Sequence, residues 1–292
     1  MDRKEFVKKA LMAGAVSVAI PTIPKAKNIK LKNSTYDELM NHVGFNHLPV
    51  SENRKMNTVI HKADTRGHAN HGWLDSHHTF SFASYYNPER MHFGVLRVLN
   101  DDRVSAGKGF STHPHDNMEI ISIPLKGDLE HKDSMGNVAI IKEGDVQVMS
   151  AGTGVFHSEY NKNTDEEVRF LQIWVFPNKK NVEPRYDQIS IREIAKKNEF
   201  YQVLSPNQND AGVWVHQDAW FHLGDFDKDT HAKYQLKKEG NGIYAFVLDG
   251  EVEINGEKLA KRDGYGIWNI NEISLKSISA SNILLMEVPM NM

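Results

Sequence analysis

The feature that most constrains the fold is a series of short runs rich in β-branched and aromatic residues, which begins at Thr58 and is interrupted by Gly, Asn and Asp. Short runs with turn residues between them are typical of the strands of an all-β sandwich or barrel. Helical periodicity is scarce in the same region, so we expect only a few short helices. In the first half of the chain the runs are 95–99, 119–125, 138–141, 146–149 and 169–176.

The second half of the chain repeats this texture. Gly127 to Glu130, followed by Gly144-Asp145, has a counterpart in Gly250 to Glu253, followed by Asp263-Gly264. Such repetition indicates one structural unit used twice. Asn255-Gly256 is typical of the type I′ turn of a β-hairpin. The predicted strands of this half are 201–204, 213–216, 220–223, 234–236, 243–248, 251–254 and 283–288.

The chain is long enough for two domains. Its 292 residues, 40% of them hydrophobic, suffice for two mid-sized cores. We therefore predict an all-β protein of two tandem β-barrel domains, residues 58–177 and residues 199–292. Residues 178–198 are predicted to be a charged linker, in which 191–197 forms a short helix.

Residues 1–27 are predicted to be a targeting segment. A charged opening, Asp2 to Lys9, precedes the small apolar run Ala10 to Ile20, which is too short to span a bilayer but suits a secretory signal. The opening resembles a bacterial twin-arginine signal, with Lys4 where that signal has a second Arg, so we expect export to the periplasm. The alternative is a frayed leader on a cytoplasmic protein. Residues 28–57 are polar and are predicted to be a tether.

Composition excludes several kinds of site. The sequence has no cysteine, which excludes disulfides, thiolate metal sites and cysteine nucleophiles. The formal net charge is −3 and neither half is strongly basic, so we expect no direct binding of nucleic acid. No apolar run predicts a transmembrane span, and no pattern predicts an oligomeric state. A metal ion in this protein would have to be bound by His, Asp or Glu.

Two pairs of potential metal ligands stand out. His113 and His115 flank Pro114, and His157 and Glu159 flank Ser158. Residues two apart on a strand point to the same face, so each pair directs two side chains into one interior. Three imidazoles and one carboxylate suit a divalent metal. The alternative is that these are strand histidines hydrogen-bonded to backbone carbonyls, but two pairs at this spacing favour metal binding.

The other histidines are assigned no catalytic role. Adjacent His77 and His78 point to opposite faces of a strand and cannot both bind one metal. In the second repeat the corresponding sequence is His231-Ala232-Lys233, where an ammonium replaces the second imidazole, so we expect no metal there. His68 and His71, with His77 and His78, are expected to orient neighbours or line a pocket entrance. Surface or hydrogen-bonded positions are expected for His131, His216 and His222.

The sequence around both pairs resembles a known family. Segment 107–127, which contains His113-x-His115-x₃-Glu119, resembles the first cupin motif. Segment 144–157, in which Ser150-Ala151-Gly152 precedes His157, resembles the second. Within the cupins the chain is most similar to pirins, and in particular to bacterial pirin-like bicupins, some of which are quercetin 2,3-dioxygenases. The similarity extends from about Val59 to Val288 and is densest in the runs 71–82, 112–115, 129–137 and 149–159.

This resemblance implies a bicupin of two double-stranded β-helix barrels, with one divalent transition metal in the first. Iron is the first expectation, and nickel, copper, manganese and zinc are the alternatives. Four residues separate Gly152 from His157, and Glu159 lies two places beyond it, which shifts the carboxylate ligand from Glu119, the general cupin choice, to Glu159. Glu119 is expected on the ligand side of its strand, in support of a ligand. The implied ligands are His113, His115, His157 and Glu159.

The resemblance also implies an activity. A small aromatic substrate of the quercetin type would bind through its 3-hydroxy and 4-keto oxygens, and Glu159 would take the hydroxyl proton as general base. Ring cleavage by O₂ with loss of carbon monoxide would follow. The alternatives are a non-catalytic metal-binding pirin with a regulatory or redox-sensing role, and a cupin of unrelated chemistry. Candidate walls of the pocket are Phe110, Met118, Met149, Phe156 and Trp174.

Overall fold

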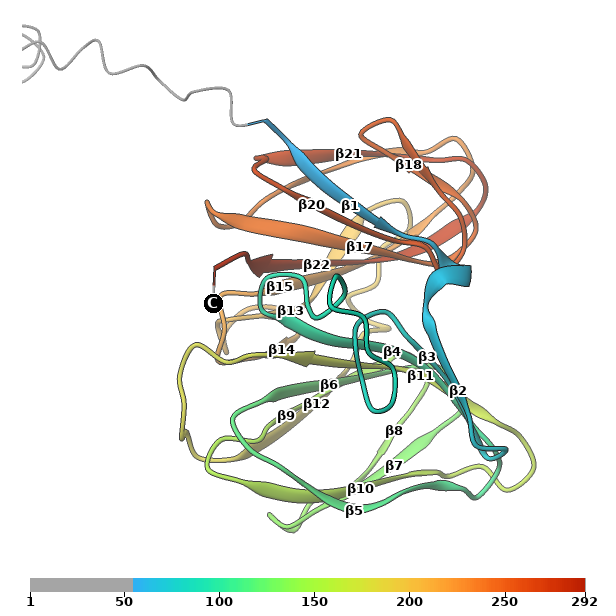
Figure 1. Cartoon of the computed structure of the whole chain (residues 1–292), viewed down its shortest axis with the longest axis vertical. Coiled ribbons are helices and arrows are strands. Elements are labelled where there is room, and N and C mark those ends of the chain that lie inside the picture. The colour runs from blue at the N-terminus through green and yellow to red at the C-terminus, as the bar shows by residue number, and fades with distance from the viewer. Residues whose placement is uncertain (1–54, 292) are drawn as a thin grey trace, which may run out of the picture. The chain divides into compact units, whose positions relative to one another are not determined.

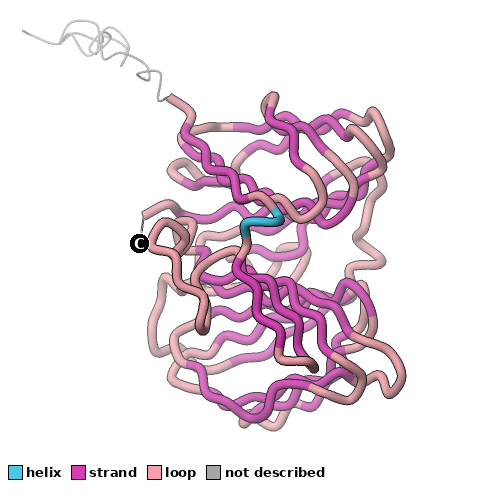
Figure 2. Tube along the Cα trace, turned by 45° about the vertical axis from the view of Figure 1, so that its right-hand side comes forward, coloured by secondary structure: helices cyan, strands magenta, loops and turns pink. Residues whose placement is uncertain are grey.

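The computed structural model of the chain describes residues 55–291. The predicted targeting segment, 1–27, lies outside this range, as do residues 28–54 of the predicted tether. The described part consists of strands joined by turns, with one 3-10 helical turn, η2 (Ala63–Thr65), which is visible in Figure 2. The predicted all-β fold class is confirmed. Within these residues no helix is long and apolar enough to cross a membrane.

The first domain consists of a seven-stranded and a four-stranded antiparallel sheet. The strand order is β12-β9-β6-β11-β4-β3-β2 in the larger sheet and β5-β10-β7-β8 in the smaller one. The bounds are β2 Gly67–Asn70, β3 Leu74–His78, β4 Leu96–Val104, β5 Gly109–His115, β6 Glu119–Lys126, β7 Leu129–Asp133, β8 Val138–Ile141, β9 Asp145–Ser150, β10 Val155–Asn161, β11 Val168–Val175 and β12 Arg185–Ser190.

The second domain repeats this plan, as the internal sequence repeat predicts. Its sheets have the orders β1-β20-β17-β22-β15-β13-β14 and β16-β21-β18-β19. The bounds are β1 Asn57–His61, β13 Phe200–Ser205, β14 Val213–Trp214, β15 Trp220–Phe226, β16 His231–Gln235, β17 Asn241–Asp249, β18 Val252–Ile254, β19 Glu257–Leu259, β20 Gly264–Trp268, β21 Glu272–Ser277 and β22 Ser281–Pro289. Asn255 and Gly256 have φ of 49° and 87° between β18 and β19, as the predicted type I′ turn requires.

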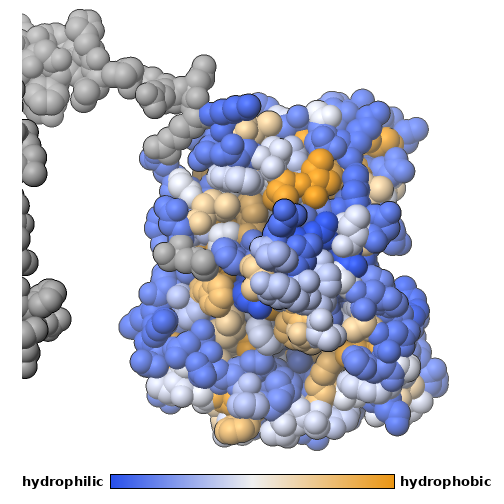
Figure 3. Space-filling model, viewed as in Figure 1, coloured by the Kyte–Doolittle hydropathy of each residue, from blue (hydrophilic) through white to orange (hydrophobic). Residues whose placement is uncertain are grey.

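The two seven-stranded sheets face each other and enclose the largest apolar cluster among residues 55–291, so the sheets lie in four layers (Figure 1). Both faces of strand β6 are buried, one against this cluster and the other against the interior of the first domain. Its sequence therefore has no polar face. The surface seen in Figure 3 is mostly hydrophilic, with small separate apolar groups. Among the residues of the cluster are Leu99, Ile121, Val148, Leu171, Ile173, Phe221, Phe246, Leu284 and Met286.

The structure differs from the predicted domain limits in two places. Strand β1, assigned by sequence to the first domain, pairs with β20 of the second. Residues 185–190 of the predicted linker form β12, which pairs with β9 of the first domain. Residues 191–197 do not form the predicted helix, because only 192–194 are a turn and Lys197 makes an isolated bridge with Asp225. Strands β1 and β12 each cross the predicted boundary to complete a sheet, and local sequence patterns do not reveal unpaired sheet edges.

Candidate metal centre

Three histidines from two neighbouring strands meet inside the first domain. His113 and His115 lie on β5, His157 lies on β10, and His113 and His157 are direct partners in the register of the two strands. The ring centroids of His157 lie 4.4 Å from those of His113 and 4.9 Å from those of His115. One nitrogen from each ring lies within 4.8 Å of the others. The structure therefore brings together three of the four residues that the sequence predicts as ligands.

A β-bulge on β5 changes the register next to the three histidines. His157 pairs with His113, but Glu159, two residues on, pairs with Phe110, three residues back. Phe110 is three residues from His113, so in a regular strand it would point to the opposite face. The extra residue on β5 turns it inward. Bulges of this kind commonly re-aim side chains beside functional sites. Along β10 the alternation is regular, so Val155, His157 and Glu159 are buried while Phe156 is exposed.

The hydrogen bonding of the imidazoles fits a metal ligand set. His113 donates from Nδ1 to the carbonyl of Ser111 at 2.8 Å, which leaves the Nε2 lone pair directed away from the backbone. Both ring nitrogens of buried His157 lack a partner among residues 55–291. A buried polar atom without a partner costs about 1–3 kcal/mol. A divalent cation would satisfy these nitrogens, so the residues present fit a bound metal.

Burial keeps the imidazoles of His115 and His157 neutral. Burial, and after it the charges of His113 and His115, lowers the pKa of His157 to about 2. Burial likewise lowers the pKa of His115 to about 4, with a further contribution from His113. Only neutral imidazole binds a metal, so these two rings have the required protonation state throughout the physiological range.

The fourth predicted residue, Glu159, adjoins the three histidines. Its carboxylate belongs to a second group of ligand atoms, with His157 and His131, all within 4.8 Å of one another. Ser122 donates to Glu159 Oε1 at 3.1 Å. Burial raises the pKa of Glu159 to about 7, with the Ser122 hydrogen bond opposing the shift and Asp102 adding to it. His157 is therefore shared by both groups.

His131 is a candidate site residue that the sequence analysis missed. It is fully buried and lies on β7 directly opposite Glu159. Its Nε2 donates to Asp133 Oδ2 at 3.0 Å, because a carboxylate only accepts, and its Nδ1 has no partner among the described residues. The hydrogen-bonded position expected for His131 is confirmed, but the surface position is not. The spacing His131-x-Asp133 repeats that of the two ligand pairs and is the signal that was overlooked.

Glu119 does not lie on the ligand side of its strand, so that expectation was wrong. On β6 it shares a face with Ile121, which packs in the cluster between the domains, whereas Ser122 on the other face contacts Glu159. Ser150 donates to Glu119 Oε2 at 2.7 Å. The error has a local cause, because Asn117 has a φ of 44° and interrupts the extended backbone between His115 and Glu119.

Replacing Glu119 with glutamine is expected to change how stability depends on pH. Burial raises the pKa of Glu119 from 4.5 to about 7, against Ser150, the backbone of His216 and Arg185, which lower it. The pKa of Glu119 is higher in the folded than in the unfolded protein, so its contribution to the free energy of unfolding is fully present below about pH 4.5. This contribution is lost as the pH rises toward 7. Between about pH 4.5 and 8 the wild-type protein should therefore lose on the order of 3 kcal/mol relative to Glu119→Gln.

Urea unfolding of both proteins at several pH values measures this difference. Parallel curves of unfolding free energy against pH for the two proteins would contradict the assignment of the shift to Glu119.

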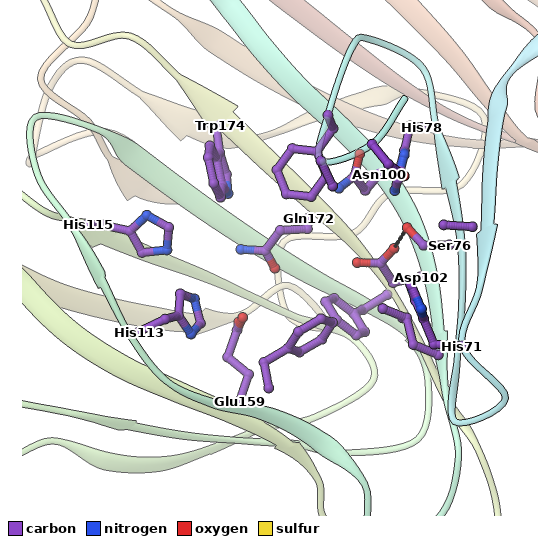
Figure 4. A pocket seen from close by; sticks show the side chains of 17 residues that line it. His71, Ser76, His78, Asn100, Asp102, His113, His115, Glu159, Gln172 and Trp174 are labelled. Carbon is purple, nitrogen blue, oxygen red and sulfur yellow. Dashed lines mark hydrogen bonds between the residues drawn. The ribbon is translucent and has the colours of Figure 1, made fainter. Parts of the chain in front are cut away.

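A cavity of about 120 Å³ lies beside the histidines. His113, His115 and Glu159 form part of its wall, and Figure 4 shows them on one side of it. Of the predicted apolar walls, Phe110 and Trp174 line the cavity. Met118 and Met149 instead pack around Ile120 in a small core, and Phe156 lies on the outer face of β10 with 55% of its surface exposed. The aromatic residues of the wall are Phe82, Phe110, Phe170 and Trp174.

The other histidines take separate positions. His78 is buried and lines the cavity with His71, while His77 on the opposite face is half-buried near Asp75, as the alternation predicts. His68, Asp75 and His77 form a third, more exposed group, in which Asp75 also binds Arg103. In the second domain, the interior is packed with apolar side chains such as Ile243, Val252, Leu275 and Leu285.

Comparisons with known proteins identify relatives of this chain. A family model described as Pirin matches residues 59–175, and one described as Quercetinase C-terminal cupin domain matches residues 202–288. A protein of Escherichia coli (strain K12) named quercetin 2,3-dioxygenase is 45% identical over 230 residues, which cover 79% of this chain and 98% of that protein. A pirin-like protein of Caulobacter vibrioides is 37% identical over 225 residues, 77% of this chain and 96% of that protein.

Solved structures show the same fold. The crystal structure of bacterial pirin YhhW from Escherichia coli in complex with nickel(II) has a TM-score of 0.76 and 43% identity, and the match covers 80% of this chain and 99% of that one. Quercetin 2,3-dioxygenase from Acinetobacter baumannii, at 20% identity, has a TM-score of 0.65 over 80% of this chain and 79% of that one, a likeness of fold alone. The predicted resemblance and the bicupin fold are confirmed.

Proposed function

We propose that this chain, which belongs to the pirin family, is a metal-dependent dioxygenase that cleaves flavonol-like 3-hydroxy-4-keto aromatics with O₂. The observation that carries this proposal is a group of three imidazoles, which shares His157 with a second group that contains Glu159, beside a cavity with aromatic walls. Relatives named quercetin 2,3-dioxygenase support it. Export by residues 1–27 remains part of the proposal and rests on the sequence alone.

The proposed metal ligands are His113, His115, His157 and Glu159. When bound there, a divalent transition metal would supply a cation for the enolate oxygens and, if it is redox-active, a route to O₂. Iron remains our first expectation, and nickel gains support from the nickel(II) complex of the YhhW relative. Imidazole and carboxylate ligands by themselves do not choose between these metals.

Glu159 is the proposed general base. Its carboxylate lies in the cavity wall, beside the histidines, where it can accept the 3-hydroxyl proton of a bound substrate. Ser122 donates its hydroxyl to Glu159 Oε1 at 3.1 Å, which holds the carboxylate in place. The residues Phe110 and Trp174 would exclude water from the chelating part of the substrate.

The size of the cavity restricts how such a substrate enters. About 120 Å³ is below the roughly 300–1,000 Å³ typical of sites for drug-sized ligands. A cavity of this size suits one substituted ring. A three-ring flavonol would therefore have to displace wall residues to bind with its chelating oxygens beside the histidines.

Oxygen uptake with quercetin, measured on metal-loaded and metal-free protein, tests this function. We expect uptake and carbon monoxide release only from the loaded protein, with iron or nickel found by mass spectrometry in protein purified without added ions. A loaded protein that retains its metal and consumes no O₂ would overturn the proposal. That result would favour the alternative of a non-catalytic, metal-binding regulatory pirin.

A further inference from the structure

The cavity has a second polar end, opposite the candidate metal ligands. Figure 4 shows Ser76, His78, Asn100 and Asp102 on this side, with Gln172 between them and Glu159. All four side chains are at most 5% exposed. None of them belongs to a group of potential metal ligands among the described residues. The proposed chemistry of the metal centre assigns them no role.

Strand geometry explains why these four side chains meet. Ser76 and His78 lie two apart on β3, Asn100 and Asp102 lie two apart on β4, and each pair therefore shares a face. The register of the two antiparallel strands sets Ser76 opposite Asp102 and His78 opposite Asn100. The four residues thus form a compact quartet on the inner face of the large sheet, which we call the acceptor quartet.

The hydrogen bonds of the acceptor quartet are incomplete. Ser76 donates its hydroxyl to Asp102 Oδ1, and no other group in residues 55–291 donates to this carboxylate. Asn100 Oδ1 and His78 Nδ1 are buried and have no partner in the same range. Buried polar groups in folded proteins nearly always have partners, and unpaired ones therefore point to a ligand or ordered water. The atoms without a partner are mainly hydrogen-bond acceptors, so they suit a ligand that donates hydrogen bonds.

Aromatic side chains complete the surroundings. Phe82 and Trp174 pack edge to face at 5.3 Å between their ring centroids, and both line the cavity. Phe82 also contacts the ring of His78. A ligand at this end therefore meets flat apolar walls and hydrogen-bond acceptors together. Phenolic hydroxyl groups on an aromatic ring have this combination of properties, whereas a metal cation or a purely apolar ring does not.

We propose that the acceptor quartet is a substrate-recognition subsite, in which Asp102, supported by Ser76, accepts hydrogen bonds from phenolic hydroxyl groups remote from the chelating oxygens. The inference rests on the proposed function for the identity of the substrate. It makes Asp102 a specificity-determining residue. The metal centre would hold the part of the substrate common to all flavonols, and the quartet would select those that carry further hydroxyls.

The test compares two ligands that share the chelating unit. Quercetin carries hydroxyls on its outer rings, and 3-hydroxyflavone carries none beyond the 3-hydroxyl. Binding to metal-loaded protein is measured by quenching of tryptophan fluorescence, and turnover is measured separately by oxygen uptake. We expect the wild-type protein to bind quercetin about tenfold or more tightly than 3-hydroxyflavone, which is the effect of about one good hydrogen bond.

Variants of Asp102 should remove this preference. Asp102→Leu is expected to bind the two ligands equally, through weaker binding of quercetin, and Asp102→Asn should retain part of the preference. Glu119→Gln is the matched control, because Glu119 is an equally buried carboxylate of the same domain that faces away from the cavity. Should Asp102→Leu fail to fold, Ser76→Ala and Asp102→Asn test the same hydrogen bonds.

The outcomes separate this inference from the proposed reaction. A preference lost with Asp102 in the binding assay supports the subsite even if neither ligand is consumed. If folded Asp102 variants consume both ligands and still bind quercetin more tightly than 3-hydroxyflavone, the subsite is overturned. The proposed reaction is then unaffected. No preference in the wild-type protein, or no binding of either ligand, also overturns it.

Discussion

Replacing His157 with alanine is expected to abolish stoichiometric metal binding and, with it, oxygen uptake. His157 belongs to both groups of ligand atoms, so its loss leaves neither group complete. The fall in metal affinity should exceed the roughly 10–100-fold that follows when a residue that merely supports a ligand is removed. In metal-free protein the effect on folding should be modest, because the substitution also removes two buried nitrogens that have no partner in the described chain.

Two measurements make this prediction specific. Metal content after desalting gives the stoichiometry, and thermal unfolding with and without added metal gives the stabilisation by binding, which should vanish in the variant. His222→Ala is the matched control, because His222 is a buried histidine of the second domain whose Nδ1 also has no partner among residues 55–291. It should keep one metal per chain. A His157→Ala protein that retains one tightly bound metal would refute the proposed ligand set.

The sequence predicted the site best where strand alternation is regular. The spacing of His157 and Glu159 on β10 sufficed to place both side chains in one interior, because β10 continues without interruption. It failed for Glu119, because a residue with positive φ separates it from His115 and reverses the expected face. Periodicity arguments hold only within one unbroken strand.

Contacts between distant segments were the other source of error. Nothing local to β7 indicates that His131 lies opposite Glu159, since that pairing depends on the register of two strands. The quartet of Ser76, His78, Asn100 and Asp102 likewise depends on the pairing of β3 with β4. Strand β1 joins the second domain by pairing with β20, a contact between segments that are far apart in the sequence. Local pattern predicted which residues face inward, and tertiary pairing decided which of them meet.

Replacing Glu159 with glutamine is expected to lower turnover of a flavonol by about 10²-fold or more at saturating metal, the usual range for loss of a general base. Glutamine keeps the shape and one oxygen of the side chain, and Ser122 can still donate to that oxygen. Three imidazoles remain, so metal should still bind, though less tightly. Turnover that is lost while the metal is retained would show that Glu159 acts in proton transfer and not only as a ligand. The test therefore requires kcat and metal content from the same preparation.

Glu130→Gln is the control for this substitution, because Glu130 is a carboxylate on the outer side of neighbouring β7 that forms ion pairs with Lys132 and Lys162. Its turnover should match that of the wild-type protein. If metal-saturated Glu159→Gln retained turnover within about twofold, Glu159 would act at most as a ligand. The proton of the 3-hydroxyl would then need another acceptor, and buried His131, 0% exposed and opposite Glu159, would be the next residue to replace.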